Sequence, residues 1–482
     1  MPGRTDYATP LRPQPDDAAR GERAWALGIT VAALGLLGVA GLLMGLGPGG
    51  LRETGVVLVF GAAVACWVSN RFDDTHVALA AAAAVVLLGA LEPDDLFETL
   101  GAEQIWLLVA AFVLASGVNR TGLPARAAVA LIGRARTARG LVHLITAGVL
   151  LSALLVPSTS GRAALLLPVH TALASVFAGR RRLVHALALL FPTVVLLSAV
   201  ATLVGAGAHL ITSQLLAETT GEGIGFGQWL LWGAPLAVVS SHAAAELVLL
   251  LFTRHADRRA RLTVDAAELR RAMGIPDRVR REEVRAAVLL LAVVVLWTTE
   301  PLHSMPPALV ALGGALLITS PKVGTVRLGT AVAEIPWSLL LFMAATTGLG
   351  LALTSSGVAD QLATALLSTG SGPALLISVV VLSTLAHLLV QSRSARSSVL
   401  VPLVIPAAAA AGLNPVALAF ASTAAAGFCH TLPSSAKPVA LFSAGYAPRD
   451  LLKLSAALGP VLAGLVLLFA TQVWPLLGLP LK

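Results

Sequence analysis

The sequence predicts an all-α polytopic membrane protein in which about 11 transmembrane helices, two re-entrant hairpins and two broken helices form an inverted repeat. Three observations lead to this fold class. First, 57% of the 482 residues are hydrophobic and only 12% are charged, whereas soluble domains carry about 25% charged residues. Second, apolar runs of about 16 to 27 residues recur along the chain. Third, one polar motif occurs twice within such apolar surroundings.

Apolar segments long enough to cross a bilayer follow directly after a polar N-terminal stretch. Residues 1–24 are expected to form a cytoplasmic tail. The next apolar run is longer than a signal-peptide core and lacks a clear cleavage site, so it is the first predicted span. The predicted spans lie at about residues 25–46, 54–69, 76–91, 104–118, 184–216, 227–253, 286–301, 306–320, 335–355, 416–448 and 451–478.

Two further pairs of apolar segments, at 141–178 and 373–412, have short arms and polar residues at their centres. If each pair is a hairpin that returns to its own side, most of the 33 lysine and arginine residues fall in cytoplasmic segments, as the positive-inside rule requires. The N-terminus is then cytoplasmic, the first hairpin enters from the cytoplasm and the second from outside. The basic segment 254–285 becomes a cytoplasmic linker between a first half, 25–253, and a second half, 286–482.

The repeated polar motif lies at the centre of each interrupted pair. Its copies read STSGRAALLLP from Ser158 and SRSARSSVLVP from Ser392. Both follow the pattern S-x-S-x-R, then two small residues, three apolar residues and proline. Matching interrupted segments in two halves are typical of inverted-repeat folds that bind a ligand near the midplane of the membrane.

The chemistry of the two motifs favours an anion as that ligand. The second arm of each hairpin begins just after the serines, so its unpaired backbone N–H groups face the tip, and the hydroxyl and guanidinium groups add further donors. A buried arginine costs roughly 3 kcal/mol on membrane-insertion scales, so it requires a partner or a role. The alternative for Arg162 and Arg396 is structural: each pairs with an acid or caps backbone carbonyls that hold its hairpin.

Each half contains a second interruption, at 198–214 and at 430–446, where Gly/Ala or Ser/Pro runs break a long apolar span. Irregular backbone at membrane depth is tolerated beside a cavity or within protein, so these breaks are expected to complete the two half-sites; close helix packing is the alternative for the glycines. His209 and Glu246, the only acid expected to be well buried, are candidate proton carriers. The candidate substrate ligands are Ser158, Thr159, Ser160, Arg162, Ser392, Arg393, Ser394, Arg396, Gly205, Gly207, Ser434, Ser435 and Lys437.

Several longer stretches carry a family resemblance when they are taken together: IWLLVAAFVLASGVNRTGL, FGQWLLWGAPLAVV, IPWSLLLFMAATTGLGLALTSSGVADQLA, GLNPVALAFASTAAAGFCHTLP and FSAGYAPRDLLKLSAALGPVLAGLVLLF. Through them the chain, from about residue 50 to its end, resembles the divalent anion:sodium symporter family of the ion-transporter superfamily. The resemblance implies hairpin tips that bind substrate and help to form sodium sites. It also implies a transport domain that moves as an elevator within a homodimer.

The hairpin tips depart from the pattern of that family. Each tip there carries Ser-Asn-Thr, whereas the tips here read Ser158-Thr159-Ser160 and Ser392-Arg393-Ser394. An arginine cannot ligate Na⁺ and would repel it by roughly 4 kcal/mol at a separation of 4 Å with an effective dielectric constant near 20. We therefore expect fixed arginine charge to replace bound sodium charge. Na⁺ is disfavoured as a cofactor, and no other cofactor or metal is expected.

Taken together, the sequence predicts a secondary transporter of a small anion, a dicarboxylate or a sulfate-like oxyanion, that works by exchange or by proton linkage in a bacterial inner membrane. Two alternatives are a cation/proton antiporter of the same superfamily, which needs buried carboxylates that are scarce here, and a non-transporting anion-binding relative. An enzyme is disfavoured because the histidines are scattered singly over different spans. Acidic residues between the arginines of the linker argue against nucleic-acid binding.

Overall fold

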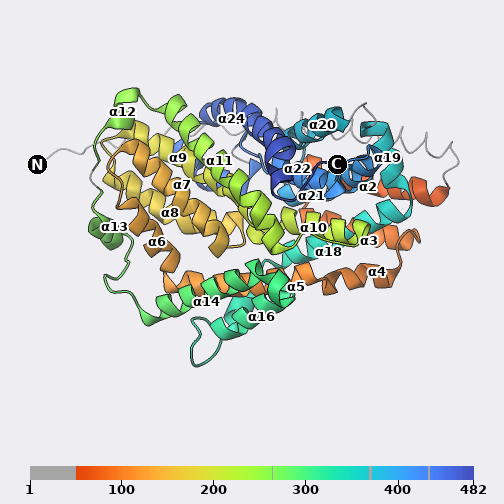
Figure 1. The fold of residues 1–482 in the computed structure, drawn as a ribbon, viewed down its shortest axis with the longest axis horizontal. Helices are drawn as coiled ribbons and strands as arrows, with labels where there is room; N and C mark the ends of the chain where they lie inside the picture. Colours follow the sequence, from red (N-terminus) through yellow and green to blue (C-terminus); the bar gives the residue numbers. More distant parts are fainter. Residues whose placement is uncertain (1–49, 263, 368–371, 433–434) are drawn as a thin grey trace, which may run out of the picture.

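The computed structural model describes residues 50–262, 264–367, 372–432 and 435–482. Their regular structure is helical apart from one isolated β-bridge (Figure 1). The predicted tail and first span lie outside the described residues. Six helical segments are long and apolar enough to cross a membrane: Arg52–Ser69, Pro93–Thr121, Arg181–Ala201, Phe226–Phe252, Trp337–Ser355 and Pro448–Leu476. The prediction of an all-helical membrane protein is thus confirmed.

Several of the other predicted spans form shorter helices. Among them are α3 (Asp74–Leu87), α16 (Pro307–Ile318) and α22 (Pro415–Ala426), which contain 14, 12 and 12 residues. At 1.5 Å per residue, each covers about 18 to 21 Å of a hydrocarbon core that is roughly 30 Å thick. Length alone therefore supports six full crossings among the described residues, against about 11 predicted for the whole chain.

Helices from both halves of the chain form a group that we call the frame helices: α2, α3, α5, α14, α16 and α18. α16 packs on α5 (Glu103–Thr121) and on α14 (Arg281–Thr298), while α3 packs on α2 (Leu51–Ser69) and on α18 (Trp337–Ser355). In Figure 1, α5, α14 and α16 lie together along the lower edge of the molecule. The frame helices supply one wall of the cavity described below.

Each repeated motif lies at the tip of a helical hairpin. In the first hairpin, α7 (Ala138–Leu155) runs to the tip and α8 (Thr159–Val176) runs away from it. In the second, α20 (Gly372–Leu385) and α21 (Arg393–Ala410) have the same arrangement. The first helices of the two hairpins begin at Ala138 and Gly372, slightly before the predicted starts at residues 141 and 373.

The first serine of each motif is the N-cap of the second arm. The hydroxyl oxygen of Ser158 accepts a hydrogen bond from the Gly161 backbone N–H at 3.2 Å, and that of Ser392 accepts one from the Ala395 N–H at 3.3 Å. Serine is a favoured N-cap because it satisfies a backbone donor that the helix itself leaves unpaired. The repeat in the sequence is therefore a repeat of helix starts.

Both predicted helix breaks are present. α9 (Arg181–Leu197) gives way to two short turns of 3₁₀-helix, after which α10 (Gly207–Thr220) continues. α22 ends at Ala426, and residues 427–432, before α23 (Lys437–Leu441), form turns and irregular backbone. At the C-terminal ends of α9 and α22, backbone carbonyl groups therefore have no partner within their own helix.

The hairpins and the broken helices pack reciprocally. α7 and α8 pack on α9, and α20 and α21 pack on α22. Each hairpin also packs on the broken helix of the other half: α8 packs on α23, and α21 packs on α10. Figure 1 shows α10 beside α21 and α22. α11 (Phe226–Phe252) and α24 (Pro448–Leu468) follow the broken helices and pack on α9 and α22, respectively. This exchange brings both hairpin tips and both breaks together.

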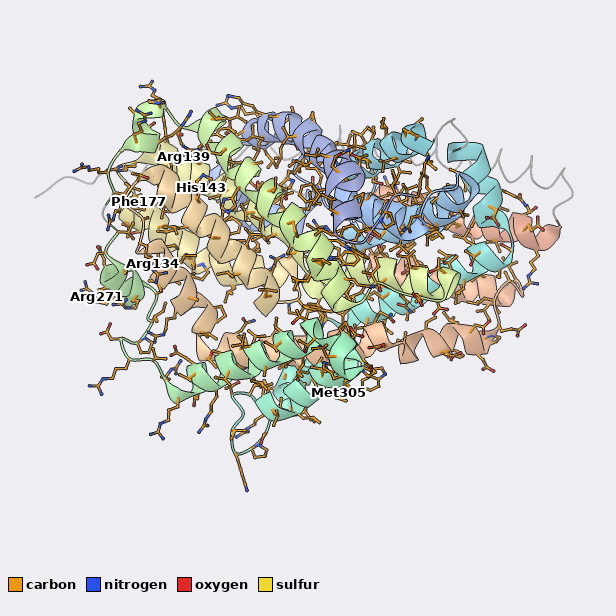
Figure 2. The ribbon with its side chains drawn as sticks, viewed as in Figure 1. Arg134, Arg139, His143, Phe177, Arg271 and Met305 are labelled. Atoms are coloured by element: carbon orange, nitrogen blue, oxygen red, sulfur yellow. The ribbon has the colours of Figure 1, made fainter. Side chains whose placement is uncertain are left out.

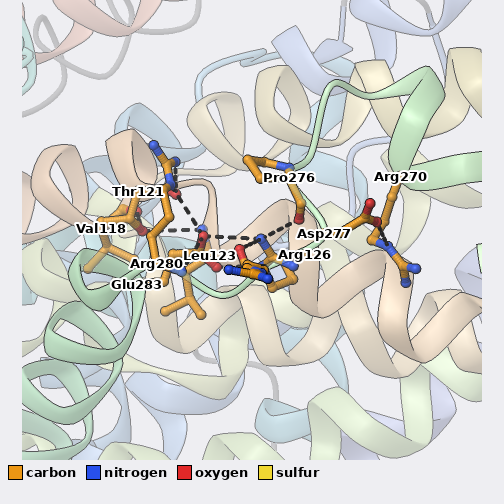
Figure 3. Close-up of polar contacts among 10 residues, drawn as sticks. Val118, Thr121, Leu123, Arg126, Arg270, Pro276, Asp277, Arg280 and Glu283 are labelled. Carbon is orange, nitrogen blue, oxygen red and sulfur yellow. Dashed lines mark hydrogen bonds and ion pairs between the residues drawn. The ribbon is translucent and has the colours of Figure 1, made fainter. Parts of the chain in front are cut away.

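The segment that the sequence predicted as a linker contains two short helices, α12 (His255–Arg259) and α13 (Ala266–Ala272), and runs along the outside of the first hairpin. Figure 3 shows the polar contacts that attach the end of this segment to Arg126. Arg126 forms an ion pair with Glu283 and donates to the Pro276 carbonyl at 2.7 Å. Glu283 is only 1% exposed, so a buried carboxylate lies where the sequence suggested a solvated, basic segment.

Candidate functional site

A cavity of about 480 Å³ lies where the hairpin tips and the helix breaks meet. Residues from both tips and both breaks line it, together with the turn between α2 and α3 and the first residues of α18. Ten predicted ligands are among the lining residues: Ser158, Thr159, Ser160, Gly207, Ser392, Arg393, Ser394, Arg396, Ser435 and Lys437. Ser434 lies outside the described residues. The remaining four predicted site residues do not line the cavity.

Several helices begin at the cavity wall, among them α8, α10 and α21. The first residues of α8, α10 and α21 are Thr159, Gly207 and Arg393, and all three line the cavity. The first turn of a helix has backbone N–H groups without intrahelical partners and carries the positive end of the helix dipole. Together with the serine hydroxyls of both tips, these N–H groups make the cavity a set of hydrogen-bond donors suited to an anion.

Arg393 joins the two breaks and keeps free donors. Its Nη2 donates to the Leu196 carbonyl at 3.0 Å, at the end of α9, and to the Gly427 carbonyl at 2.6 Å, at the end of α22. Its Nε and Nη1 are buried and have no hydrogen-bond partner among the described residues. A guanidinium group on the two carbonyl ends is favourable because helix C-termini carry partial negative charge.

Arg396 also donates to a backbone carbonyl, but only at the second break. Its Nη1 donates to the Phe428 carbonyl at 2.8 Å, just after α22. Its Nε and Nη2 are buried without a partner in the described part of the chain, although the side chain is 1% exposed and lines the cavity. Buried donors without acceptors are costly, and the adjacent cavity is where an acceptor fits.

Arg162 differs from its counterpart in the second motif. It is fully buried, and its Nη1 donates to the Ser198 hydroxyl at 2.8 Å while its Nη2 donates to the Val195 carbonyl at 2.9 Å. Both acceptors belong to the C-terminal end of α9 and the break that follows. The structure thus gives Arg162 the carbonyl-capping arrangement that the sequence left as the alternative, and it does not bring this side chain to the cavity.

The two glycines of the first break serve different needs. A Cβ at Gly205 would lie 2.1 Å from the Ala199 carbonyl oxygen, so this glycine allows the chain to pass itself closely. A Cβ at Gly207 would lie 2.7 Å from Leu339 Cδ1 and 3.2 Å from the Ser394 hydroxyl oxygen, both on the cavity wall. Gly205 therefore fits the packing alternative, whereas Gly207 allows the start of α10 to lie close to Leu339 of α18 and to the second tip.

Neither predicted proton carrier lies in the cavity wall. The Nδ1 atom of His209 lies 3.0 Å from the Thr202 carbonyl oxygen, and its ring stacks on Trp229 with centroids 4.8 Å apart. Glu246, on α11, accepts a hydrogen bond from Arg139 Nε at 2.7 Å and lies 2.6 Å from His143 Nε2.

Figure 2 labels these two partners of Glu246 on α7. The Glu246 side chain is 31% exposed, so the prediction that it is well buried is wrong. Hydropathy placed it inside a span but could not show that it lies at the periphery, facing an arginine and a histidine.

The sequence analysis missed the polar residues that the frame helices contribute. Asn70 and Asp74 line the cavity from the turn between α2 and α3, and Gln391 lines it beside the second tip. Asn70 Nδ2 donates to Gln391 Oε1 at 3.1 Å. Asp74 and Ser392 of the second tip line the same cavity. The sequence feature at this position is the acidic pair Asp73-Asp74 directly before an apolar run, which is typical of an ordinary helix start.

The charged residues of the cavity wall, among the described residues, are Arg393, Arg396, Lys437 and Asp74. Three cations facing one carboxylate leave the cavity with an excess of positive charge. No group of three or more His, Cys, Asp or Glu side chains suited to a metal ion occurs in the described part of the chain. The volume falls within the range of about 300 to 1,000 Å³ that small-molecule sites occupy.

Comparisons with known proteins also indicate a membrane transporter of carboxylates. A family model described as citrate transporter matches residues 64–425. A membrane protein of Cupriavidus necator is 26% identical over 77% of this chain and 74% of its own length. The sodium-dependent dicarboxylate transporter SdcS of Staphylococcus saprophyticus is 23% identical over 82% of this chain and 81% of its own. The putative malate transporter YflS of Bacillus subtilis is 24% identical, with coverages of 83% and 86%.

Among solved structures, the fold is similar to that of the YdaH transporter of Alcanivorax borkumensis, with a TM-score of 0.54. The alignment covers 82% of this chain and 88% of that one at 17% identity, so it supports the fold alone. The resemblance found in the sequence pointed to the divalent anion:sodium symporters. The matching family model instead carries the description citrate transporter, and a sodium-dependent dicarboxylate transporter is one of the distant relatives.

Proposed function

The chain belongs to the citrate transporter family, within the ion-transporter superfamily, and from this premise we propose that it is a secondary transporter that carries a small di- or tricarboxylate by exchange or with protons. Membership of a transporter family also means that the protein is not an enzyme. The observation that carries the proposal is the pair of arginines in the cavity. Arg393 and Arg396 line a space bounded by two serine tips, and each has buried N–H groups without a hydrogen-bond partner among the described residues.

The donor set favours a ligand with at least two carboxylates. A guanidinium group matches a carboxylate geometrically, because two parallel N–H groups can meet both oxygens. Lys437 adds a third positive charge from the second break, and the N-terminus of α8 faces the cavity from the first tip. The two carboxylates of a dicarboxylate can therefore each find donors on a different side of the cavity.

The same contacts support transport without bound sodium. Sodium requires oxygen ligands, and the carbonyls at the two breaks are the natural source of them. The carbonyls of Leu196, Gly427 and Phe428 already accept hydrogen bonds from Arg393 or Arg396. A sodium ion at these oxygens would have to displace a guanidinium group and would be repelled by it. In our proposal, the guanidinium groups of Arg393 and Arg396 take the place of a coupling sodium ion.

We further propose an inverted repeat and an elevator-type movement within a homodimer. The reciprocal packing of α8 on α23 and of α21 on α10 supports the repeat, because it relates each hairpin to the opposite broken helix. In this scheme the hairpins at 141–178 and 373–412 enter from opposite sides of a bacterial cytoplasmic membrane. The halves 25–253 and 286–482 are joined by the cytoplasmic linker 254–285, and the N-terminus is cytoplasmic.

Substrate counterflow tests the substrate class. Proteoliposomes containing the purified protein are loaded with unlabelled citrate, malate, succinate or sulfate, and uptake of the same radiolabelled anion is followed. We expect accumulation with at least one carboxylate and little with sulfate, which lacks two separated charged groups. Counterflow of sulfate alone would replace the carboxylate by an oxyanion. An absence of counterflow despite anion binding would favour the non-transporting relative.

A cation/proton antiporter is the remaining candidate within the superfamily. Such a carrier requires carboxylates that bind the cation in the transport site. The described cavity wall offers the Asp74 carboxylate alone, against three positively charged side chains. The charge balance of the cavity therefore favours an anion over a cation.

A further inference from the structure

We propose that Asp74 is the coupling carboxylate of the carrier: it neutralises the second hairpin tip when the cavity is empty and takes up a proton when the anion binds. This inference rests on the proposed function of the cavity. It assigns the proton linkage to a residue outside the repeated motifs. Neither His209 nor Glu246, the carriers that the sequence suggested, lines the cavity.

Asp74 stands on a different helix from the other charged groups of the cavity. It is the first residue of α3, which packs on α2 and α18. Arg393, Arg396 and Lys437 belong to α21 and α23, which pack against α10 and α8. Asp74 thus faces the hairpins from the frame helices, across the space in which the ligand would bind.

The carboxyl group of Asp74 shares the cavity with groups that a substrate would need, among them Ser392 and Lys437. Burial raises the pKa of this carboxyl group, and the Ser392 hydroxyl and the charge of Lys437 act in the opposite direction. Ser392 also caps α21, so its position relative to the tip is fixed by the helix start. A carboxylate ligand in the cavity competes with Asp74 for these two groups. The side chain of Asp74 therefore acts as an internal substitute for the ligand.

The groups around Asp74 define its charge balance. On its own element, Asp73 caps α3 by accepting hydrogen bonds from the Thr75 and His76 N–H groups at 3.0 Å, and His76 and Arg71 are exposed. From the hairpins and the second break, Arg393, Arg396 and Lys437 line the same cavity. The beginning of α18 contributes only Pro336 and Leu339. Burial raises the pKa of Asp74, and the positive charge around the empty cavity opposes this effect.

Binding of the anion reverses this balance. Once the arginines and Lys437 are engaged by the ligand, an ionised Asp74 faces like charge without its former partners, which favours its protonated form. The proton comes from solution, joins a carboxylate oxygen of Asp74, and leaves when the ligand is released. Binding is then accompanied by proton uptake, so the affinity for the anion rises as the pH falls.

Isothermal titration of the purified full-length protein with succinate, at about pH 6 and about pH 8, tests the linkage. The variant Asp74→Asn has no site for the proton. The matched control Asp73→Asn alters the neighbouring carboxylate outside the cavity and retains a good N-cap. Succinate itself titrates in this range, but equally for every protein, so the ratio of variant to wild-type affinity at each pH isolates Asp74.

We expect Asp74→Asn to bind succinate about tenfold more tightly than the wild type at pH 8, and with nearly equal affinity at pH 6. Asp73→Asn should follow the wild type at both values. Asp74→Glu, which restores the charge, should regain the wild-type dependence. A wild-type pH dependence in Asp74→Asn, or weaker binding at both pH values, would overturn the inference. A wild type that binds no carboxylate at all would instead overturn the proposed function, and this inference with it.

Discussion

Replacement of Arg396 by glutamine should weaken the binding of the carboxylate substrate strongly. Arg396 lines the cavity, and its Nε and Nη2 are buried and have no hydrogen-bond partner in the described part of the chain. A hydrogen bond to a charged group contributes about 1.5 to 3 kcal/mol, and glutamine can restore one neutral donor of the two. The net loss is about 2 to 3 kcal/mol, which corresponds to an affinity about 30- to 150-fold weaker.

The matched control is Arg162→Gln, which changes the equivalent arginine of the first motif. Its guanidinium group donates to Ser198 and Val195 and does not reach the cavity. We expect Arg162→Gln to leave the affinity within about threefold while lowering the free energy of unfolding by about 1 to 3 kcal/mol, because buried acceptors lose their donor. Isothermal titration gives the affinities and thermal unfolding in detergent gives the stabilities. Wild-type affinity in Arg396→Gln together with lost affinity in Arg162→Gln would refute the assignment of the two arginines.

Three further changes have distinct expected outcomes. Gly207→Ala should reduce counterflow without preventing folding, because the new methyl group meets the movable Leu339 side chain. Gly205→Ala should abolish the folded protein in size-exclusion chromatography, because its methyl group meets a backbone carbonyl. Equal behaviour of the two variants would contradict their assigned roles. Ser158→Ala should cost about 1 kcal/mol of stability through the lost N-cap and should also weaken binding, and a loss of stability alone would remove this serine from the site.

The last of these predictions concerns pH. Burial raises the pKa of Glu283, but hydrogen bonds from Arg126 and Arg280 outweigh it and hold the pKa below the usual value. Because the lowered pKa favours the ionised form in the folded state, Glu283 stabilises the protein above the unfolded-state pKa of about 4.3, and this contribution is lost as the pH falls further. Melting curves of Glu283→Gln should therefore show a weaker acid dependence than those of the wild type, and identical acid dependence would exclude the ion pair as its source.

The parts of the fold that the sequence predicted well are those encoded by local chemistry. Ser158 and Ser392 begin helices within apolar segments, and a serine that caps a helix is recognisable wherever the helix lies. The glycine-rich first break was equally visible, because Gly205 permits a passage that no side chain tolerates. These local signals were sufficient to locate both hairpins and both broken helices.

The parts that could not be predicted depend on which side of a helix a residue faces. Arg162 and Arg396 occupy equivalent positions in the repeat, yet one caps α9 and the other lines the cavity. Glu246 lies within an apolar helix but faces Arg139 at the periphery. Asp74 joins the site only because the fold brings the start of α3 to the same cavity as the second hairpin tip, and no pattern near residue 74 indicates this long-range arrangement.

Counterflow of the identified carboxylate with and without Na⁺ tests the central claim most directly. The claim is that the guanidinium groups of Arg393 and Arg396 occupy the carbonyl ends where a coupling sodium ion would bind. We predict equal rates when Na⁺ is replaced by choline or K⁺ on both sides of the membrane. Strict dependence on Na⁺ would contradict the account, because it would require a sodium site that coexists with both buried arginines.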